Sequence, residues 1–418
     1  MNNLPRLMVI KGGGGVPVER LCDSLLRIAR LVLVNVNSSN PRLEVPHEEA
    51  TAVLADRGTF VPVSSYEAHT EICTAATKEP VDGILTTSEH CMILAADVAA
   101  ELGLPHISPD VARTVRDKYR QRSALQKAGV PCPAFARIAS ASDLEAAAAT
   151  VPTPAVLKPA SGAGGHNTFQ VNSAKDLPTL YEVGRSGEVE LGAGDEPVFI
   201  LEEMLIGESW HETDGWGDYA SVESFHMNGE TLPICITDRT PLAPPFRETG
   251  VFLPSTLPAH RADSLRACAD SAAKALGIDH GITHTEIKFT AHGPRIIEVN
   301  ARLGGHMGYV FGHATGRDIV EEAGRLALGI RPDMDFEFKR HVGWILVTPP
   351  QSENPVRAYG LDRIKDIPNV EFVTLSSAST LDWHSGELAD PALVTAVAGN
   401  ADELLQTQQQ IMETVEFR

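Results

Sequence analysis

The chain has 418 residues, of which 43% are hydrophobic and 22% are charged, a composition typical of a globular protein with two or three domains. Its formal net charge of −20 argues against nucleic acid or an anionic membrane surface as a partner. No segment approaches the ~20 apolar residues of a membrane span. The six scattered cysteines form neither a zinc motif nor a disulfide framework, so a reduced, cytoplasmic location is expected.

Residues 1–110 alternate apolar strands with helical segments, which predicts a small parallel α/β domain. An apolar strand over residues 6–10 leads toward four consecutive glycines, Gly12 to Gly15, and a helical pattern follows. The Rossmann fingerprint is not met, because Pro17 stands near the place of its third glycine. Later, Glu89 ends a polar turn that follows a strand, where open sheets bind ligands. It is therefore a candidate for binding a substrate amino group, and a simple helix-dipole partner is the alternative.

One helix is predicted from about Val111 to Ala128, where glycine and proline end it, and it carries Lys118. A short buried strand then delivers Lys158 to the glycine-rich loop SGAGGH, residues 161–166. Such a loop turns backbone N–H groups toward phosphate oxygens, while the lysine supplies a point charge. The Walker sequence is absent, so a P-loop NTPase is excluded.

Another strand, residues 198–201, runs into the segment from Glu202 to Glu208, in which Met204 and Leu205 suit an apolar purine pocket. Residues 219–255 then alternate as strands do. Three charged residues of that region are candidates for contacting substrate or phosphate, although solvent exposure explains each of them better when taken singly. They are Arg239, Arg247 and Glu248.

The segment 283–306 reads THTEIKFTAHGPRIIEVNARLGGH and has the alternation and the turn of a β-hairpin. A three-residue loop centred on His292 would place Glu286 directly opposite Glu298. Facing carboxylates repel each other and invite a cation. With the amide oxygen of Asn300 they make an all-oxygen site that suits Mg²⁺ better than zinc.

Arg302 and the pair Gly304-Gly305 follow at once, bringing a permanent positive charge and a close backbone beside the metal. Taken singly, Glu286 or Glu298 is better explained as a polar residue on an exposed hairpin. Taken together, these residues favour phosphoryl chemistry. Beyond them, residues 331–418 predict a third unit of strands and a final helix, to which we assign no chemistry.

The pattern of Glu286, then Glu298-x-Asn300-x-Arg302 and Gly-Gly, resembles the metal site of the ATP-grasp superfamily. THTEIK and IIEVNARLGG are most similar to its carboxylate-amine ligases, in particular the L-amino acid ligases that make dipeptides. The resemblance implies a multidomain α/β and α+β fold in three parts. These are an N-terminal parallel α/β domain (1–110), a central ATP-grasp domain (111–328) with a mobile lid at about 135–200, and a small C-terminal cap (329–418).

The same resemblance implies roles for individual residues. One or two Mg²⁺ ions, or Mn²⁺ in their place, would be held by Glu286, Glu298 and Asn300. Arg302 would act in catalysis, and His284 would be either an orienting residue or a base. ATP would be bound by a larger set, in which either Glu208 or His211 meets the ribose: Lys118, Lys158, Ser161, Gly162, Gly164, Gly165, Glu202, Glu203, Leu205, Glu208 and His211. The substrates would meet Glu89, Arg302, Gly305 and His306, and His306 would set the size of the first substrate's pocket.

The expected function is an ATP-dependent ligase that activates a carboxylate as an acyl phosphate and joins it to an amine, releasing ADP and phosphate. Its partners would be two small molecules, for which amino acids are the leading candidates, and a homodimer is compatible with this reading. One alternative is an ATP-grasp carboxylase or nucleotide-biosynthesis ligase, which differs in its acceptor. Another is a regulatory subunit that binds ATP without turnover, which is disfavoured because the metal ligands and the arginine are all present.

Overall fold

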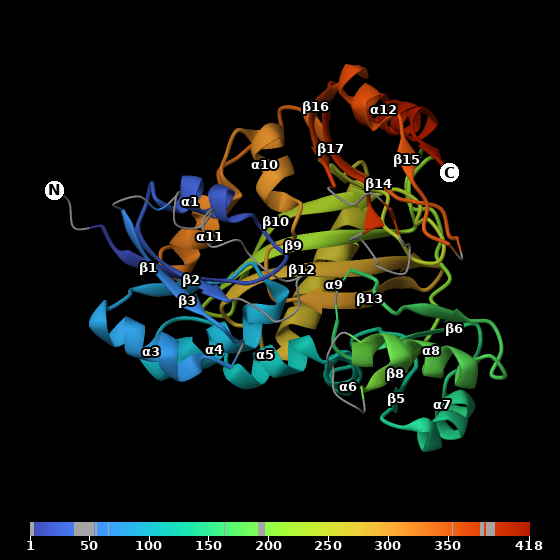
Figure 1. Cartoon of the computed structure of the whole chain (residues 1–418), viewed down its shortest axis with the longest axis horizontal. Helices are drawn as coiled ribbons and strands as arrows, with labels where there is room; N and C mark the ends of the chain where they lie inside the picture. Colours follow the sequence, from blue (N-terminus) through green and yellow to red (C-terminus); the bar gives the residue numbers. More distant parts are fainter. Residues whose placement is uncertain are drawn as a thin grey trace.

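The computed structural model of the chain describes most of its residues, and all statements below concern these: 4–36, 54, 57–65, 67–162, 164–190, 197–352, 354–376, 380–381 and 389–418. Figure 1 shows the N-terminal part (blue) at one end of the molecule and the segment of residues 135–200 (teal to green) at the other. A broad sheet lies between them. None of the described helices is long and apolar enough to cross a membrane.

The N-terminal part is built on a parallel sheet, as predicted. In the described residues its strand order is β3-β2-β1-β4, with β1 Arg6–Lys11, β2 Arg30–Val36, β3 Gly58–Val63 and β4 Gly83–Leu85. The inner strands read as continuous apolar runs because helices cover both faces. These helices are α1 Val18–Leu25, α3 His69–Lys78 and α4 Met92–Leu102, the last preceded by the 3₁₀ turn η2 Glu89–Cys91.

The central sheet is antiparallel and, within the described ranges, has the order β13-β12-β9-β10-β11-β14-β17-β16. Its strands are β9 Tyr219–Met227, β10 Glu230–Arg239, β11 Gly250–Leu253, β12 Gly281–Thr290, β13 Gly293–Asn300, β14 His341–Val347, β16 Val370–Leu375 and β17 Ala392–Ala398. Helix α9, Ala259–Leu276, packs against one face of it through a buried stripe of alanine and leucine. Figure 1 shows α9 lying behind β12 and β13.

The expected lid region forms a separate sheet with the order β5-β8-β6-β7 in the described residues. It contains β5 Phe135–Ile138, β6 Ala155–Pro159, β7 Phe169–Val171 and β8 Phe199–Glu203, covered by α7 Leu144–Thr150, which follows the turn η3 Ala141–Asp143, and by α8 Leu177–Glu190. Its apolar side chains make a core of their own, which includes Leu157 and Phe199. Ala163 and residues 191–196 of the expected lid lie outside the described residues.

The helix predicted from Val111 to Ala128 is in fact two helices, α5 Pro109–Arg116 and α6 Lys118–Lys127. The break occurs because Asp117 takes an extended conformation and its side chain accepts a hydrogen bond from the backbone N–H of Arg120. An N-cap aspartate thus outweighs the helical spacing that runs through it. Lys118 therefore begins a helix, and its backbone N–H donates to Ala160 O at 2.8 Å.

The last quarter of the chain continues the central sheet through β14, β17 and β16. The remaining elements are α10 Met307–Thr315, α11 Ile319–Ala327, β15 Ala358–Tyr359, η4 Leu361–Asp366, α12 Ala401–Thr414 and β18 Glu416–Phe417. Helix α12 packs on β14 and β17 in a core that includes Ile345 and Ile411. The boundary that we propose after residue 328 is thus crossed by hydrogen bonds between β11 and β14.

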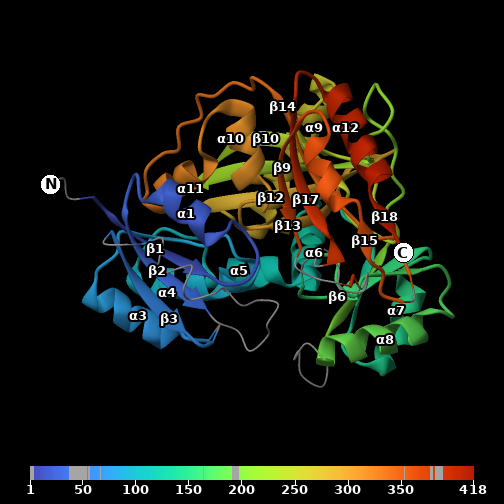
Figure 2. The same ribbon diagram turned by 45° about the horizontal axis from the view of Figure 1, so that its top comes forward.

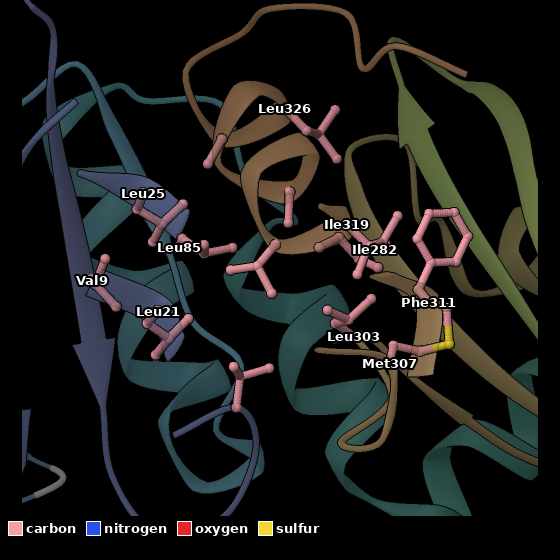
Figure 3. Close-up of a cluster of buried hydrophobic side chains, with 14 of the residues drawn as sticks. Val9, Leu21, Leu25, Leu85, Ile282, Leu303, Met307, Phe311, Ile319 and Leu326 are labelled. Atoms are coloured by element: carbon pink, nitrogen blue, oxygen red, sulfur yellow. The ribbon is translucent and has the colours of Figure 1, made fainter. Parts of the chain in front are cut away.

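One apolar core joins the N-terminal part to the central sheet. Figure 3 shows side chains of β1 and α1, such as Leu25, facing others from α10, α11 and the turn that holds Leu303. Figure 2 shows α1 and α11 side by side. They lie close together at Gly324, where a Cβ would come within 2.4 Å of Leu25 Cδ2 and would force that side chain to shift. Burial of each large side chain here contributes roughly 1.5–3 kcal/mol to stability, and this core therefore holds the N-terminal sheet beside the hairpin.

Candidate active site

A cavity of about 240 Å³ is lined by residues of the lid sheet and of the central sheet. From the lid come Lys158 and three glycines of the predicted phosphate loop, Gly162, Gly164 and Gly165. From the central sheet come Glu286 and Glu298, while Lys118 adds its side chain from the start of α6. The purine-slot segment contributes Glu202, Glu203, Met204 and Leu205. Residues far apart in the sequence therefore share one space.

The hairpin β12–β13 pairs Glu286 directly with Glu298, as predicted. The predicted loop was wrong, since Thr290 pairs with Gly293 and only two residues lie between them. A β-bulge after Glu286 restores the register, because Ile297 is an extra residue on β13. Its carbonyl accepts a hydrogen bond from the buried guanidinium of Arg122. The acidic pair thus depends on a bulge that a distant arginine holds.

Both predicted lysines make ion pairs in the cavity wall. Lys118 Nζ lies 2.9 Å from Glu298 Oε1 and donates to Gly162 O at 3.1 Å. Lys158 Nζ lies 2.8 Å from Glu202 Oε2, and the other oxygen of Glu202 lies 2.9 Å from Arg122 Nε. Burial raises the pKa of Glu202, but these two cations outweigh it, and the net shift is downward. Glu202 is therefore an ionised anchor for Lys158.

His284 lies between two carboxylates. Its Nδ1 makes a short hydrogen bond to Glu223, and its Nε2 lies 3.2 Å from Glu286 Oε1. Burial lowers the pKa of His284, but the two carboxylates outweigh it and raise the pKa to about 9. Both ring nitrogens are occupied, an arrangement that favours an orienting role over that of a base.

Arg302 is held by Glu89, from the N-terminal part of the chain. Its Nε donates to Glu89 Oε2 at 2.7 Å, and Arg116 Nη1 donates to the other oxygen at 2.6 Å. Burial raises the pKa of Glu89, but the two guanidinium groups lower it to about 2. Both oxygens of Glu89 are therefore engaged by arginines, so the structure supports an anchoring role for Glu89 more directly than the expected contact with a substrate amino group.

His306 follows the glycine pair and is 4% exposed. Its ring lies 5.6 Å from that of His284 and 5.9 Å from that of Trp344. Burial and the nearby cations Arg239, His284 and Arg302 lower its pKa well below 6.5, so the ring is neutral. Its Nε2 has no hydrogen-bond partner among the described residues. Gly305, on the same turn, does not line the cavity, nor does His306.

Seven other predicted residues, although described, do not line this cavity either: Glu89, His284 and Arg302, whose contacts are given above, and Ser161, Glu208, His211 and Asn300. Ser161 donates to Arg116 O at 3.1 Å, and Glu208 is exposed. His211 stacks on Trp216 with ring centroids 5.0 Å apart, and burial lowers its pKa to about 4. Asn300 is buried and pairs with His284 across the ladder, two positions away from the acidic pair.

The sequence reasoning missed Tyr219 and Glu223 on β9, although the polar alternation Tyr219, Ser221, Glu223 was available as a signal. It also favoured solvent exposure for Arg239 and Arg247, and that expectation was wrong. Both are buried, at 1% and 4% exposure. Arg239 donates to Ser221 Oγ at 2.7 Å and pairs with Glu248, which lines the cavity.

Two regions of the chain match known families. Residues 33–106 match the ATP-grasp N-terminal domain, and residues 151–309 match the ATP-grasp domain. The second region contains the glycine-rich loop, the hairpin and Arg302.

Similar proteins include an alanine–anticapsin ligase and a carnosine synthase. Alanine–anticapsin ligase of Bacillus subtilis (strain 168) is 34% identical over 231 residues, which cover 54% of this chain and 49% of that protein. Carnosine synthase 1 of Homo sapiens is 28% identical over 271 residues, covering 60% of this chain and 31% of that protein. The match thus spans about half the length of the alanine–anticapsin ligases.

The whole fold resembles that of a solved structure, the L-amino acid ligase from Bacillus licheniformis. The two align with a TM-score of 0.79 over 100% of this chain and 99% of that chain, at 21% sequence identity. At this identity the likeness establishes the fold. Since the matched regions, the fold and the hairpin pattern agree, the chain contains ATP-grasp domains and has the ATP-grasp fold.

Proposed function

We propose that the chain is an ATP-dependent carboxylate-amine ligase that joins two amino acids. The observation that carries the proposal is the shared cavity, in which Lys118, Lys158 and the glycine loop face the acidic pair Glu286 and Glu298. Phosphoryl transfer asks a protein chiefly for positioning and charge neutralisation, and these groups supply both. The similarity to amino acid ligases supports amino acids as the substrates.

The donor set fits a magnesium–nucleotide complex. Glu286 and Glu298 face each other across the ladder and both line the cavity, so they offer carboxylate oxygens to one or two hard cations. Asn300 lies on the same face, two residues beyond Glu298. When bound, ATP would supply the γ-phosphoryl group that activates the carboxylate, and a metal held by Glu286 and Glu298 would offset the charge of the phosphates.

The nucleotide would span the cavity from the lysines to the apolar end. Lys118 and Lys158 would leave Glu298 and Glu202 in part to meet phosphate oxygens, and the N–H groups of Gly162, Gly164 and Gly165 would close over them. Val156, Met204 and Leu205 line the other end and suit a purine. Closure of the loop would exclude water that hydrolyses an acyl phosphate.

Arg302 is the residue to which we assign stabilisation of the transferring phosphoryl and of the tetrahedral oxyanion. Its Nε is held by Glu89 and its Nη1 donates to Leu303 O at 3.2 Å. The Nη2 group is then the donor assigned to the reacting oxygens. A guanidinium fixed in this way needs no reorganisation when the negative charge develops.

The test is release of ADP and phosphate by the purified chain, screened over pairs of L-amino acids with Mg²⁺ and ATP. We expect release that requires both amino acids, together with a dipeptide detected by mass spectrometry. Release that requires bicarbonate or a ribonucleotide instead would assign the chain to the carboxylase or nucleotide-biosynthesis alternative. ATP binding without turnover for any pair would overturn the proposal.

A further inference from the structure

Glu223 is a fully buried carboxylate on β9, at 0% exposure, and it lies beneath the proposed metal site. The three strands β9, β12 and β13 align polar residues in two adjacent rows. One row is Glu223, His284 and Asn300, and the next is Ser221, Glu286 and Glu298. Side chains paired across a ladder lie on one face of the sheet, and the two rows are two residues apart on every strand, so both rows belong to the same face.

Glu223 makes contacts in two directions. One oxygen makes the short hydrogen bond to His284 Nδ1, and the opposite nitrogen of that ring lies 3.2 Å from Glu286 Oε1. The other oxygen accepts from the backbone N–H of Gly304 at 3.3 Å. Glu223 is therefore connected both to a proposed metal ligand and to the turn that follows Arg302.

The packing around this carboxylate is close. A Cβ at Gly304 would lie 3.0 Å from Glu223 Oε1, from His284 Nδ1 and from His306 Cε1. Contacts at that distance are tighter than nine in ten real Cβ contacts, so an alanine here would force these side chains to move by a few tenths of an ångström. The turn, the imidazole and the carboxylate thus fix one another.

We propose that Glu223 is a positioning residue: through His284 it holds Glu286 in its metal-binding orientation, and through Gly304 it holds the turn beside Arg302. This inference rests on the proposed function only in assigning the metal to Glu286. The carboxylate–imidazole–carboxylate chain corresponds to the outer-shell support that metal ligands use elsewhere, whose loss typically weakens metal affinity about 10–100-fold.

A different interpretation is that Glu223, His284 and His306 bind a transition metal themselves, since their ligand atoms lie within 4.8 Å of one another. Two observations favour the positioning role. Glu223 and His284 are already in direct hydrogen-bond contact. The guanidinium groups of Arg239 and Arg302 act on the same cluster and oppose a further dication.

The test measures Mn²⁺ binding by electron paramagnetic resonance in the presence of excess ATP. In Glu223→Gln we expect the Kd for Mn²⁺ to rise about 10–100-fold, while the Kd for ATP measured in EDTA stays within about twofold. His284→Gln should give a similar loss, and the double variant should be no worse than either single one, because both act along one chain of contacts. Additive losses, or unchanged Mn²⁺ affinity in Glu223→Gln, would overturn the proposal.

Glu230→Gln is the matched control, since this carboxylate lies on the neighbouring strand, is exposed and pairs with Arg331. It should leave Mn²⁺ binding unchanged. If Glu223→Gln fails to fold, Gly304→Ala keeps every charge and crowds the same contacts, and it should weaken Mn²⁺ binding several-fold. An unchanged Kd in that variant would contradict the proposal.

The result of the Mn²⁺-binding test can be distinguished from that of the ligation test, because the binding assay contains no amino acid. Intact Mn²⁺ binding without ligation would refute only the proposed function. Tight Zn²⁺ binding to the nucleotide-free chain that is lost in His306→Ala would favour the metal interpretation of the cluster and overturn this one. Absence of ATP-dependent Mn²⁺ binding in the wild-type chain would overturn the metal assignment and the role of Glu223 with it.

Discussion

Arg302 and His306 stand on either side of the Gly304-Gly305 turn, and their surroundings give them opposite charge states. Arg302 is a fixed cation because Glu89 engages its Nε. His306 is a neutral ring because burial and neighbouring cations disfavour its protonation. The turn therefore separates a group suited to anionic transition states from one suited to contact a neutral part of the substrate.

Replacing Arg302 with alanine should slow ligation about 10²–10³-fold, as expected for loss of one preorganised donor to an oxyanion. ATP affinity should change little, since the phosphate lysines remain. Amino-acid-dependent ADP release and ATP binding measured on the same preparation test this expectation. The ligation rate of Arg302→Lys should lie between those of the wild type and of Arg302→Ala. Full activity in Arg302→Ala would show that Arg302 has no part in the mechanism.

Replacing His306 with alanine should change which amino acids are accepted more than it changes ATP affinity. The substitution removes a buried ring that packs against His284 and Trp344, and so opens space beside the turn. Relative kcat/KM values over amino acids of graded size provide the measurement. An unchanged substrate profile would refute a role for His306 in the first substrate's pocket.

Single residues also show where sequence reasoning reaches its limit. Glu89 was recognised as a candidate from its position after a strand, but its partners Arg116 and Arg302 come from other elements. Glu223 was not predicted as a site residue. It lies on a strand that is buried on both faces, where polar alternation does not mark a solvent-facing side. Position along an element is readable in a sequence, whereas the partner that neutralises a buried charge is set by tertiary packing.

At the scale of elements, the hairpin illustrates both success and error. Alternation of polar residues placed Glu286 and Glu298 on their faces correctly, because side chains alternate along strands, whereas their pairing was predicted from a three-residue loop that the structure does not have. The two-residue turn and the bulge at Ile297 were not readable, since the bulge carbonyl is taken by Arg122 from α6. The turn is one residue shorter than predicted and the bulge adds one residue to β13, so Glu286 still pairs with Glu298.

Arg122 therefore deserves a stability test of its own. In Arg122→Leu the buried Glu202 would lose one of its two cations and the bulge would lose its donor, which should cost about 3–5 kcal/mol. Urea unfolding measures the loss. Arg120→Leu is the matched control on the same helix, with a side chain 60% exposed, and should shift stability by less than about 0.5 kcal/mol. Equal effects of the two substitutions would contradict the anchoring role of Arg122.

At the scale of the whole molecule, buried neutral histidines couple folding to pH. Burial lowers the pKa of His226 to about 4, although Asp270 opposes this shift. The unfolded chain binds a proton at this residue near pH 6.5 and the folded chain does not. The contribution of the neutral His226 ring to the free energy of unfolding is therefore complete above pH 6.5 and is lost as the pH falls toward 4.

His226→Gln should remove the one proton that this residue binds in the unfolded chain and not in the folded chain. The slope of unfolding free energy against pH should be smaller than in the wild type by about 1.4 kcal/mol per pH unit between roughly pH 6 and 4.5. Urea unfolding at a series of pH values measures both slopes. Identical slopes would show that the ring of His226 is not kept neutral by folding.

The antiparallel ladder that runs from the hairpin to β16 has a practical consequence for protein engineering. Cutting the chain after residue 328 would uncover the long side of β11, which now hydrogen-bonds to β14, and a bare strand of this kind recruits foreign strands and aggregates. Chimaeras that exchange the last quarter of the chain with that of a related protein must therefore supply a strand that matches β11. Loss of activity in such a shortened chain would therefore reflect the exposed edge of β11 and would not show that the removed residues take part in catalysis.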